Sequence, residues 1–301
     1  MILCIGEILA DLIGRKEGDK LSLDVRAGGA PFNVACNAKF AEAEVGFYGR
    51  VGRDTIGNYL VNFVDKIGLD YPIITRDLTR NTTLAFVTLD ENGEREFSFN
   101  RHDTADYNLS MNDFSLDSFP NLKIVHLGSL MLSEEVGRIF AKKLVRELKK
   151  RNILFSFDIN LRFDLFESVD DAILKNKWFV EHADILKFSE DELTMYTGME
   201  DVSSGIEKVG FSGKLFALTL GKRGSMFMYN GVKKIVSTTP VTVVDSTGAG
   251  DAFLGALLAK LDKSDVNRLD IDVLTSYFEY SNKVASFSVT KFGAINRFDI
   301  K

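Results

Sequence analysis

Residues 242–253, Thr-Val-Val-Asp-Ser-Thr-Gly-Ala-Gly-Asp-Ala-Phe, decide how the rest of the chain is interpreted. Residues 242–244 predict the end of a buried strand, residues 246–248 a tight turn, and the apolar run 250–259 a buried helix. The small residues 248–250 would then lie between a strand and a helix N-terminus. Backbone N–H groups and the helix dipole at such a position favour a bound anion, phosphate above all.

Asp251 follows in the first turn of the predicted helix, so its carboxylate would lie beside that anion. A carboxylate at this place could accept the proton of a hydroxyl group that attacks the phosphorus. The same residues also fit an ordinary turn before a helix in which Asp serves as a cap or dipole partner. Spacing alone does not separate the two interpretations.

The composition is that of an ordinary globular protein. The 301 residues are 45% hydrophobic and 27% charged, which leaves room for one large domain or two modest ones. A net charge of -6 argues against nucleic acid or an anionic membrane as the main partner. No apolar run approaches membrane-spanning length and the N-terminus lacks the basic segment of a signal peptide, so we expect a cytoplasmic protein. Cys4 and Cys36 lie in apolar settings and are expected to be reduced thiols.

The chain before residue 120 predicts a mixed pattern that contains a β-hairpin. Residues 83–89 and 94–100 predict two strands, and the Asp-Glu-Asn-Gly turn between them is typical of a hairpin. A hairpin inserted into a βα pattern is a candidate lid over a site, together with the polar segment 14–25. The other elements expected here are a strand at 2–9, a helix from 27 to about 43, a strand at 45–51 and a helix at 54–67.

After residue 120, strands and helices alternate. The predicted strands are 123–128, 153–158, 184–188 and 214–220, and the predicted helices are 134–151, 168–182, 190–197 and 276–293. This alternation predicts an α/β fold with a doubly wound, mostly parallel sheet and helices on both faces. Such folds bind ligands at the carboxyl ends of their strands. Polar residues follow three of these strands, at 158–162, 187–189 and 219–224.

Three better-known phosphate-binding patterns do not fit. Neither Gly-Lys pair, at 213–214 and 221–222, is followed by the Ser or Thr that a P-loop requires. The dinucleotide fingerprint lacks its third glycine at 248–253 and would come too late in the chain. The strand and catalytic-loop signatures of protein kinases are absent from the sequence.

Two segments resemble the ribokinase-like (PfkB-type) carbohydrate kinases, and the resemblance covers essentially the whole chain. They are Gly-Gly-Ala-Pro-Phe-Asn-Val-Ala at 28–35 and Asp-Ser-Thr-Gly-Ala-Gly-Asp at 245–251. The first segment is similar to the fructokinase branch, whereas ribokinases usually carry Lys-Gly-Ala-Asn there and ketodeoxygluconate kinases typically carry Ala-Glu in place of Ala-Pro. The resemblance implies one ribokinase-like α/β domain, 1–301, with a discontinuous β-sheet lid from about 12–26 and 72–105.

The resemblance also implies an activity. ATP, with Mg²⁺ and also K⁺, would donate its γ-phosphate to a sugar hydroxyl, and fructose is the first candidate acceptor. The alternatives are a 2-keto-3-deoxygluconate kinase, a ribose or nucleoside kinase, and a sugar sensor without catalytic activity. The exposed edge of the lid sheet would invite pairing into a homodimer.

Individual residues are carried over by the same resemblance. The catalytic residues would be Asp251 as the base, Gly248, Ala249 and Gly250 as the anion hole, and Arg162 on the phosphate path. Asp11, Gly28, Gly29, Asn33, Phe99 and Arg101 would bind the sugar with Asp251. Asn160, Lys187, Glu192, Thr219, Gly221, Gly224 and Asn282 would bind the nucleotide with Gly248 and Gly250. Asp245, Thr247, Ser288 and Gly293 would hold a monovalent cation.

One position departs from the family pattern. Glu192 would hold Mg²⁺ through water, as the acid of the family's Asn-x-x-Glu motif does. Ser189 stands here in place of the Asn of that motif. Fructokinases often show this change, so the departure favours the fructokinase branch.

Overall fold

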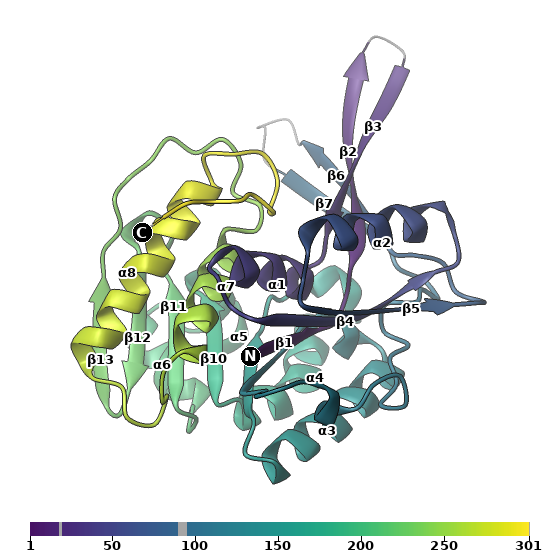
Figure 1. The fold of residues 1–301 in the computed structure, drawn as a ribbon. Helices are drawn as coiled ribbons and strands as arrows, with labels where there is room; N and C mark the ends of the chain where they lie inside the picture. Colours follow the sequence, from purple (N-terminus) through teal and green to yellow (C-terminus); the bar gives the residue numbers. More distant parts are fainter. Residues whose placement is uncertain (18–19, 90–94, 301) are drawn as a thin grey trace.

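The computed structural model describes residues 1–17, 20–89 and 95–300, and within them it contains a large and a small β-sheet (Figure 1). The strands of the large sheet are β1 (Ile2–Ile5), β4 (Val45–Gly52), β5 (Tyr71–Asp77), β8 (Ile124–Leu127), β9 (Leu154–Asp158), β10 (Ile185–Ser189), β11 (Leu215–Thr219), β12 (Ser225–Tyr229) and β13 (Val232–Val236). Their spatial order is β13-β12-β11-β10-β9-β8-β1-β4-β5. Neighbours from β11 through β5 run parallel, and β12 and β13 are antiparallel at the far edge.

Helices cover both faces of the large sheet, because its central strands are apolar on both sides. Along β1, Ile2 and Cys4 belong to one hydrophobic core, while Leu3 and Ile5 belong to the other. The first core contains side chains of α1 (Ala30–Phe40), α2 (Thr55–Ile67), α7 (Ala249–Asp262) and α8 (Ile271–Ser288). The second contains side chains of α3 (Glu135–Lys150), α4 (Val169–His182), α5 (Glu190–Thr197) and α6 (Val202–Val209). The predicted doubly wound fold is therefore confirmed.

The helices that begin at the two sequence motifs, α1 and α7, lie side by side (Figure 1). They approach so closely that a Cβ on Gly255 would lie 2.7 Å from the backbone oxygen of Val34. Glycine in α7 therefore permits the contact. Because both helices begin at the same edge of the sheet, residues that are far apart in the sequence meet there.

The small sheet comprises β2 (Leu9–Glu17), β3 (Lys20–Gly28), β6 (Leu84–Leu89) and β7 (Arg95–Asn100), in the order β3-β2-β6-β7. The antiparallel pairing of β6 with β7 confirms the predicted hairpin, whose turn lies outside the described residues. The segment 14–25 is not one strand but parts of two, which pair antiparallel. In Figure 1 the β2–β3 ribbon extends above the body of the molecule.

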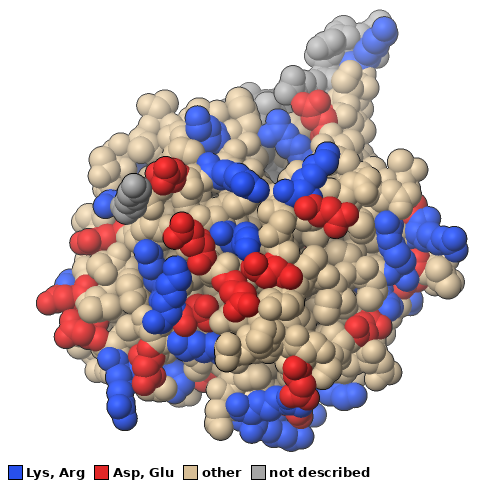
Figure 2. Space-filling view, viewed as in Figure 1, with Lys and Arg blue, Asp and Glu red and all other residues tan. Residues whose placement is uncertain are grey.

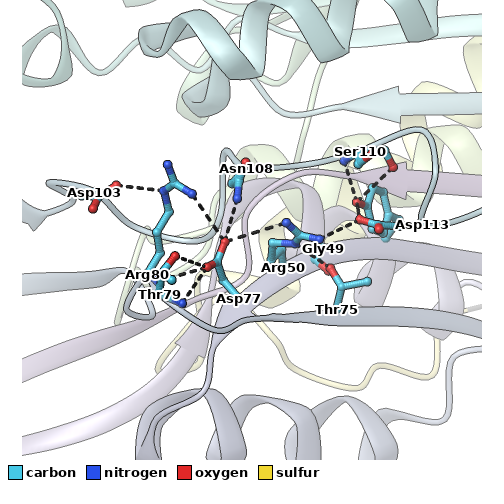
Figure 3. Close-up of polar contacts among 11 residues, drawn as sticks. Gly49, Arg50, Thr75, Asp77, Thr79, Arg80, Asp103, Asn108, Ser110 and Asp113 are labelled. Carbon is cyan, nitrogen blue, oxygen red and sulfur yellow. Dashed lines mark hydrogen bonds and ion pairs between the residues drawn. The ribbon is translucent and has the colours of Figure 1, made fainter.

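A polar network fastens the chain that follows β7 to the end of the large sheet (Figure 3). Asp77, the last residue of β5, accepts a hydrogen bond of 2.7 Å from the Asn108 side chain and bonds of 3.0 Å from the backbone N–H groups of Thr79 and Arg80. These bonds lower the pKa of Asp77, although burial opposes them. Residues 71–77 pair with β4 in the large sheet. Most of them fall inside segment 72–105, which we expected to supply part of the lid.

The structure corrects several expected elements. Residues 242–244 form no strand but part of a loop between β13 and α7, and the side chains of Val243 and Val244 are exposed. Helix α1 begins three residues later than expected, since Ala27 and Gly28 still pair with β2. Strands β5, β12 and β13 and helix α6 were not predicted, and the last helix is α8 rather than 276–293.

The surface and the thiols agree with the composition. On the face seen in Figure 2, acidic and basic side chains are intermixed rather than gathered into a field of one sign. Cys4 and Cys36 are both buried and free, as expected. Within the described residues, no helix combines the length and the apolar character that crossing a bilayer requires.

Candidate active site

A cavity of about 700 Å³ opens at the carboxyl ends of the parallel strands. Both sequence motifs contribute to its wall, together with residues that follow β1, β9 and β10 and the last residue of β11. The sequence-predicted residues that line it are Asp11, Gly29, Asn33, Phe99, Asn160, Arg162, Lys187, Glu192, Thr219, Asp245, Thr247, Gly248, Ala249, Gly250 and Asp251. The polar wall and the location at a strand edge suit a small, hydrogen-bonding ligand.

Asp251 lies in the first turn of α7, directly at this cavity. The preceding Gly248 has φ +74°, a left-handed conformation that glycine adopts readily, and it turns the chain into the helix. Asn33 of α1 donates a hydrogen bond of 2.8 Å from Nδ2 to Asp251 Oδ2. The Oδ1 atom of Asn33 is buried and has no hydrogen-bond partner among the described residues.

The surroundings of Asp251 tune its acidity. Burial raises the pKa of this carboxyl, while the hydrogen bond from Asn33 and the charges of Lys187 and Arg162 oppose the rise. A raised pKa makes a carboxylate a better proton acceptor near neutral pH. The arrangement can therefore take a proton from a hydroxyl group bound in the cavity.

Lys187 brings a buried positive charge to the same place. Its Nζ atom lies 2.8 Å from Asp158 Oδ2 and 4.0 Å from Glu192 Oε2. A Cβ on Gly250 would lie 2.9 Å from Nζ, so the ammonium group stands against the first turn of α7. Burial would lower the pKa of Lys187, but Asp158 and Glu192 outweigh it and keep the group charged. An anion at the start of α7 would meet this ammonium group as well as the helix N-terminus.

Ser189, which stands in place of the family's Asn, has a structural role of its own. Ser189 is the N-cap of α5: its Oγ accepts a bond from the N–H of Glu192, and Glu192 Oε2 accepts one of 2.7 Å from the N–H of Ser189. This reciprocal capping box satisfies two backbone donors at the helix start. It also fixes the Glu192 carboxylate in the wall of the cavity.

On the opposite side of the cavity, the small sheet supplies Asp11 from β2. A Cβ on Gly28 would lie 2.3 Å from Asp11 Oδ2, so glycine there leaves room for the carboxylate. Asp11 also borders a second cavity of about 150 Å³, which Arg26 and Gly293 help to line. The predicted sugar-side residues Asp11, Gly29 and Asn33 thus lie around one space.

Several predicted residues lie elsewhere. Arg101 is buried in an ion pair with Asp106, with 2.7 Å between Nη2 and Oδ2, and it donates a 2.6 Å bond to Ser133. It is not in the described lining of either cavity, because Asp106 and Ser133 hold its guanidinium group inside the protein. Three predicted nucleotide-binding residues, Gly221, Gly224 and Asn282, are also outside that lining; Gly221 and Gly224 follow β11, and Asn282 donates to the backbone oxygen of Val236.

The residues predicted to hold a monovalent cation come together at the end of α8. Asp245 is buried and accepts a bond of 2.7 Å from the N–H of Gly293 and one of 2.9 Å from the N–H of Thr247. Its own N–H donates to the backbone oxygen of Val289, next to Ser288. The described part of the chain contains no group of three or more His, Cys, Asp or Glu side chains that could hold a metal ion.

Sequence reasoning assigned no role to two buried carboxyl groups at strand ends, of which Glu7 lines the cavity. Glu7 follows β1 and Asp158 ends β9, and each occupies the carboxyl end of a parallel strand. That position was the available signal, since ligands of such sheets bind there. Burial raises the pKa of both groups, to about 8 for Glu7, and Lys187 opposes the rise for Asp158.

Known fructokinases are similar to this chain over nearly its whole length. Fructokinase-2 of Oryza sativa subsp. japonica is 35% identical over 301 residues, covering 98% of this chain and 90% of that protein. Two crystal structures of a fructokinase from Vibrio cholerae O395, one with fructose, ADP and potassium and one with fructose, ADP and calcium, superpose with a TM-score of 0.89 at 29% identity. Each alignment covers 98% of this chain and 94% of the other.

A sugar kinase from Pyrococcus horikoshii, solved in complex with ATP, superposes with a TM-score of 0.84 at 32% identity, covering 98% of this chain and 94% of the other. The model of the pfkB family of carbohydrate kinases matches residues 1–301. With the two motifs assembled around one cavity, this full-length match identifies the chain as a member of the pfkB family of carbohydrate kinases.

Proposed function

We propose that this protein is an ATP-dependent fructokinase that converts fructose to fructose 6-phosphate. The observation that carries the proposal is the pairing of Asn33 with Asp251 at the N-terminus of α7, with Lys187 beside the same turn. One space thus contains a proton acceptor and a cradle for a phosphate. The fructokinases among the similar proteins support fructose as the acceptor.

In this mechanism, Asp11 and Asn33 hold the sugar so that one hydroxyl group faces Asp251. Asp251 accepts the hydroxyl proton as the oxygen attacks the γ-phosphorus and ADP leaves. The backbone N–H groups of residues 248–250, with Lys187 and Arg162, stabilise the negative charge that develops on the phosphoryl oxygens. Positioning and electrostatics would supply most of the rate enhancement, because phosphoryl transfer needs little covalent chemistry from the protein.

Two cations complete the proposed site. Mg²⁺ would be held through water by Glu192 and would neutralise phosphate charge when bound. K⁺ would lie near Asp245 and the carbonyl groups around residues 288–293, where Gly293 already contacts Asp245. The potassium and calcium ions bound by the Vibrio cholerae fructokinase support the binding of a monovalent and a divalent cation.

We further propose that residues 1–301 form one catalytic domain in which the small sheet acts as a lid, and that two copies pair through it. β3 is an edge strand, and Leu21, Leu23 and Val25 point to the same face of it and are exposed. Light scattering after gel filtration should give twice the mass of the chain. Leu21→Lys together with Leu23→Lys should return the monomer, and an unchanged dimer would contradict pairing at this edge.

A panel of acceptors tests the activity. Fructose, 2-keto-3-deoxygluconate, ribose and adenosine are each incubated with ATP and Mg²⁺, and ADP release and the phosphorylated product are measured. We expect the highest kcat/KM with fructose and a product that carries phosphate on O6. A higher value for another acceptor would reassign the substrate, and ligand binding without ADP release from any acceptor would favour the sugar sensor.

A further inference from the structure

Glu7 follows β1 in the chain, and its side chain contacts the start of α1. Its side chain is only 1% exposed, and Oε1 accepts a hydrogen bond of 3.2 Å from the backbone N–H of Ala30, the first residue of α1. Glycines flank it closely: a Cβ on Gly128 would lie 2.8 Å from Oε2, and a Cβ on Gly29 would lie 2.4 Å from the backbone oxygen of Glu7. Gly29 has φ +110°, so glycine is needed there for its conformation as well.

A short series of contacts connects this clamp to the reacting groups. The backbone oxygen of Gly29 accepts a bond of 2.8 Å from the N–H of Asn33, within the first turn of α1. The Asn33 side chain in turn donates to Asp251 at 2.8 Å. A shift of the α1 N-terminus would therefore move Asn33 relative to Asp251. Displacements of about 1 Å at such positions can cost on the order of a hundredfold in rate.

Asp106, Arg101 and Asp251 are the charged residues that act most strongly on Glu7. Arg101 is already paired with Asp106, which leaves little positive charge for Glu7. Oε2 is buried and has no hydrogen-bond partner among residues 1–17, 20–89 and 95–300. Burial raises the pKa of Glu7 from 4.5 to about 8, so the group is mostly uncharged at neutral pH.

We propose that Glu7 is a positioning residue that seats the N-terminus of α1 so that Asn33 meets Asp251. The proposal rests on the proposed function, because Asp251 is taken there as the proton acceptor. The chemistry follows a general pattern, in which two carboxyl groups near one site divide into a neutral acid and an ionised base. Ionised Glu7 would add a second negative charge beside Asp251 and the incoming phosphate.

Kinetics of Glu7→Gln and Glu7→Ala test the role, with Glu207→Gln on the exposed surface of α6 as the matched control. Glu7→Gln keeps the shape and the bond to Ala30 but does not ionise, so its kcat should stay within about threefold of wild type at pH 7. Glu7→Ala should lose about tenfold or more in kcat with a smaller change in the KM for ATP. Equal losses in both variants, or no loss in Glu7→Ala, would overturn the proposal.

The pH profile separates positioning from mere structural support. Wild-type kcat/KM should fall as pH rises through about 8, and the ratio of Glu7→Gln to wild type should rise there by about threefold or more. A constant ratio between pH 6.5 and 9.5 would show that the charge on Glu7 has no effect on the reaction. Glu207→Gln should give the wild-type profile throughout.

Thermal unfolding gives a measurement that does not depend on activity. Between pH 4.5 and 8 the unfolded chain ionises Glu7 and the folded protein does not, so wild type loses stability relative to Glu7→Gln as pH rises. The Tm difference should grow over that interval and level off above it. If no acceptor in the panel is phosphorylated, the proposed function fails, but this measurement still decides whether Glu7 is uncharged. A Tm difference that does not change with pH would refute an uncharged Glu7 even in an active enzyme.

Discussion

Replacing Asp251 by Asn tests the central chemical claim with little structural disturbance. The Asn side chain has nearly the same shape, and its amide oxygen can accept the 2.8 Å bond that Asn33 now donates to Asp251. The variant should therefore keep the cavity and the start of α7. It removes the proton acceptor at this position, which is a carboxylate whose pKa is raised by burial.

The expected magnitude follows from the role of the group. Loss of a positioned proton acceptor costs about 10²- to 10⁴-fold in kcat, which corresponds to ~2.7–5.4 kcal/mol of barrier. Burial of an ionised carboxylate opposes folding, so Asp251→Asn should unfold at a Tm equal to or above that of wild type. The KM for ATP should change by less than about threefold, because the phosphate-binding N–H groups and Lys187 remain.

The assay measures ADP release with saturating fructose and identifies the sugar phosphate by mass spectrometry. The matched control is Asp272→Asn, which also alters an acid in the first turn of a helix but lies on the exposed surface of α8. It should leave kcat unchanged. A kcat for Asp251→Asn within about fivefold of wild type, in a variant with normal Tm, would remove Asp251 from the mechanism.

Three further substitutions address the phosphate cradle and its cation. Gly248→Ala should lower the free energy of unfolding by about 1–3 kcal/mol in chemical denaturation, since φ is +74° and the new Cβ would meet Ala294 Cβ at 2.2 Å; an unchanged midpoint would contradict the strain. Lys187→Met should cost about 3–5 kcal/mol in the same experiment by leaving Asp158 unpaired, and adding Asp158→Asn should restore much of the stability but not kcat. Asp245→Ala should abolish any stimulation of kcat by KCl over NaCl, and retained stimulation would place the cation elsewhere.

Much of the fold could be predicted because the large sheet is buried on both faces. Central strands such as β11 (Leu215–Thr219) are apolar up to their last residue and are bounded by polar turns, and the sequence therefore marks their limits well. Helix α5, predicted at 190–197, has the same limits in the structure because Ser189 and Glu192 form a local capping box. Local signals of this kind need no knowledge of the tertiary structure.

Elements that depend on distant partners could not be predicted in the same way. Residues 242–244 have the composition of a strand, but they form a loop that leads to α7, where the N–H of Val244 donates to the backbone oxygen of Val289 after α8. Arg101 follows a strand of the small sheet, as a substrate-facing residue would, but Asp106 and Ser133 bind it inside the protein. The sequence shows that Glu7 stands at a strand end. Its burial and its contact with the start of α1 are known only from the structure.

The charges around the cavity explain why several groups there have shifted acidity. The residues described in the wall of the cavity include five acidic ones, Glu7, Asp11, Glu192, Asp245 and Asp251. They include two basic ones, Arg162 and Lys187. A nucleoside triphosphate brings further negative charge, which two side-chain cations and one helix N-terminus do not balance. The balance must therefore be restored by metal ions that arrive with the nucleotide and by protons on carboxyl groups. An uncharged Glu7 lowers that excess by one charge. Protonation of Glu7 and binding of Mg²⁺ thus act in the same direction on the phosphate.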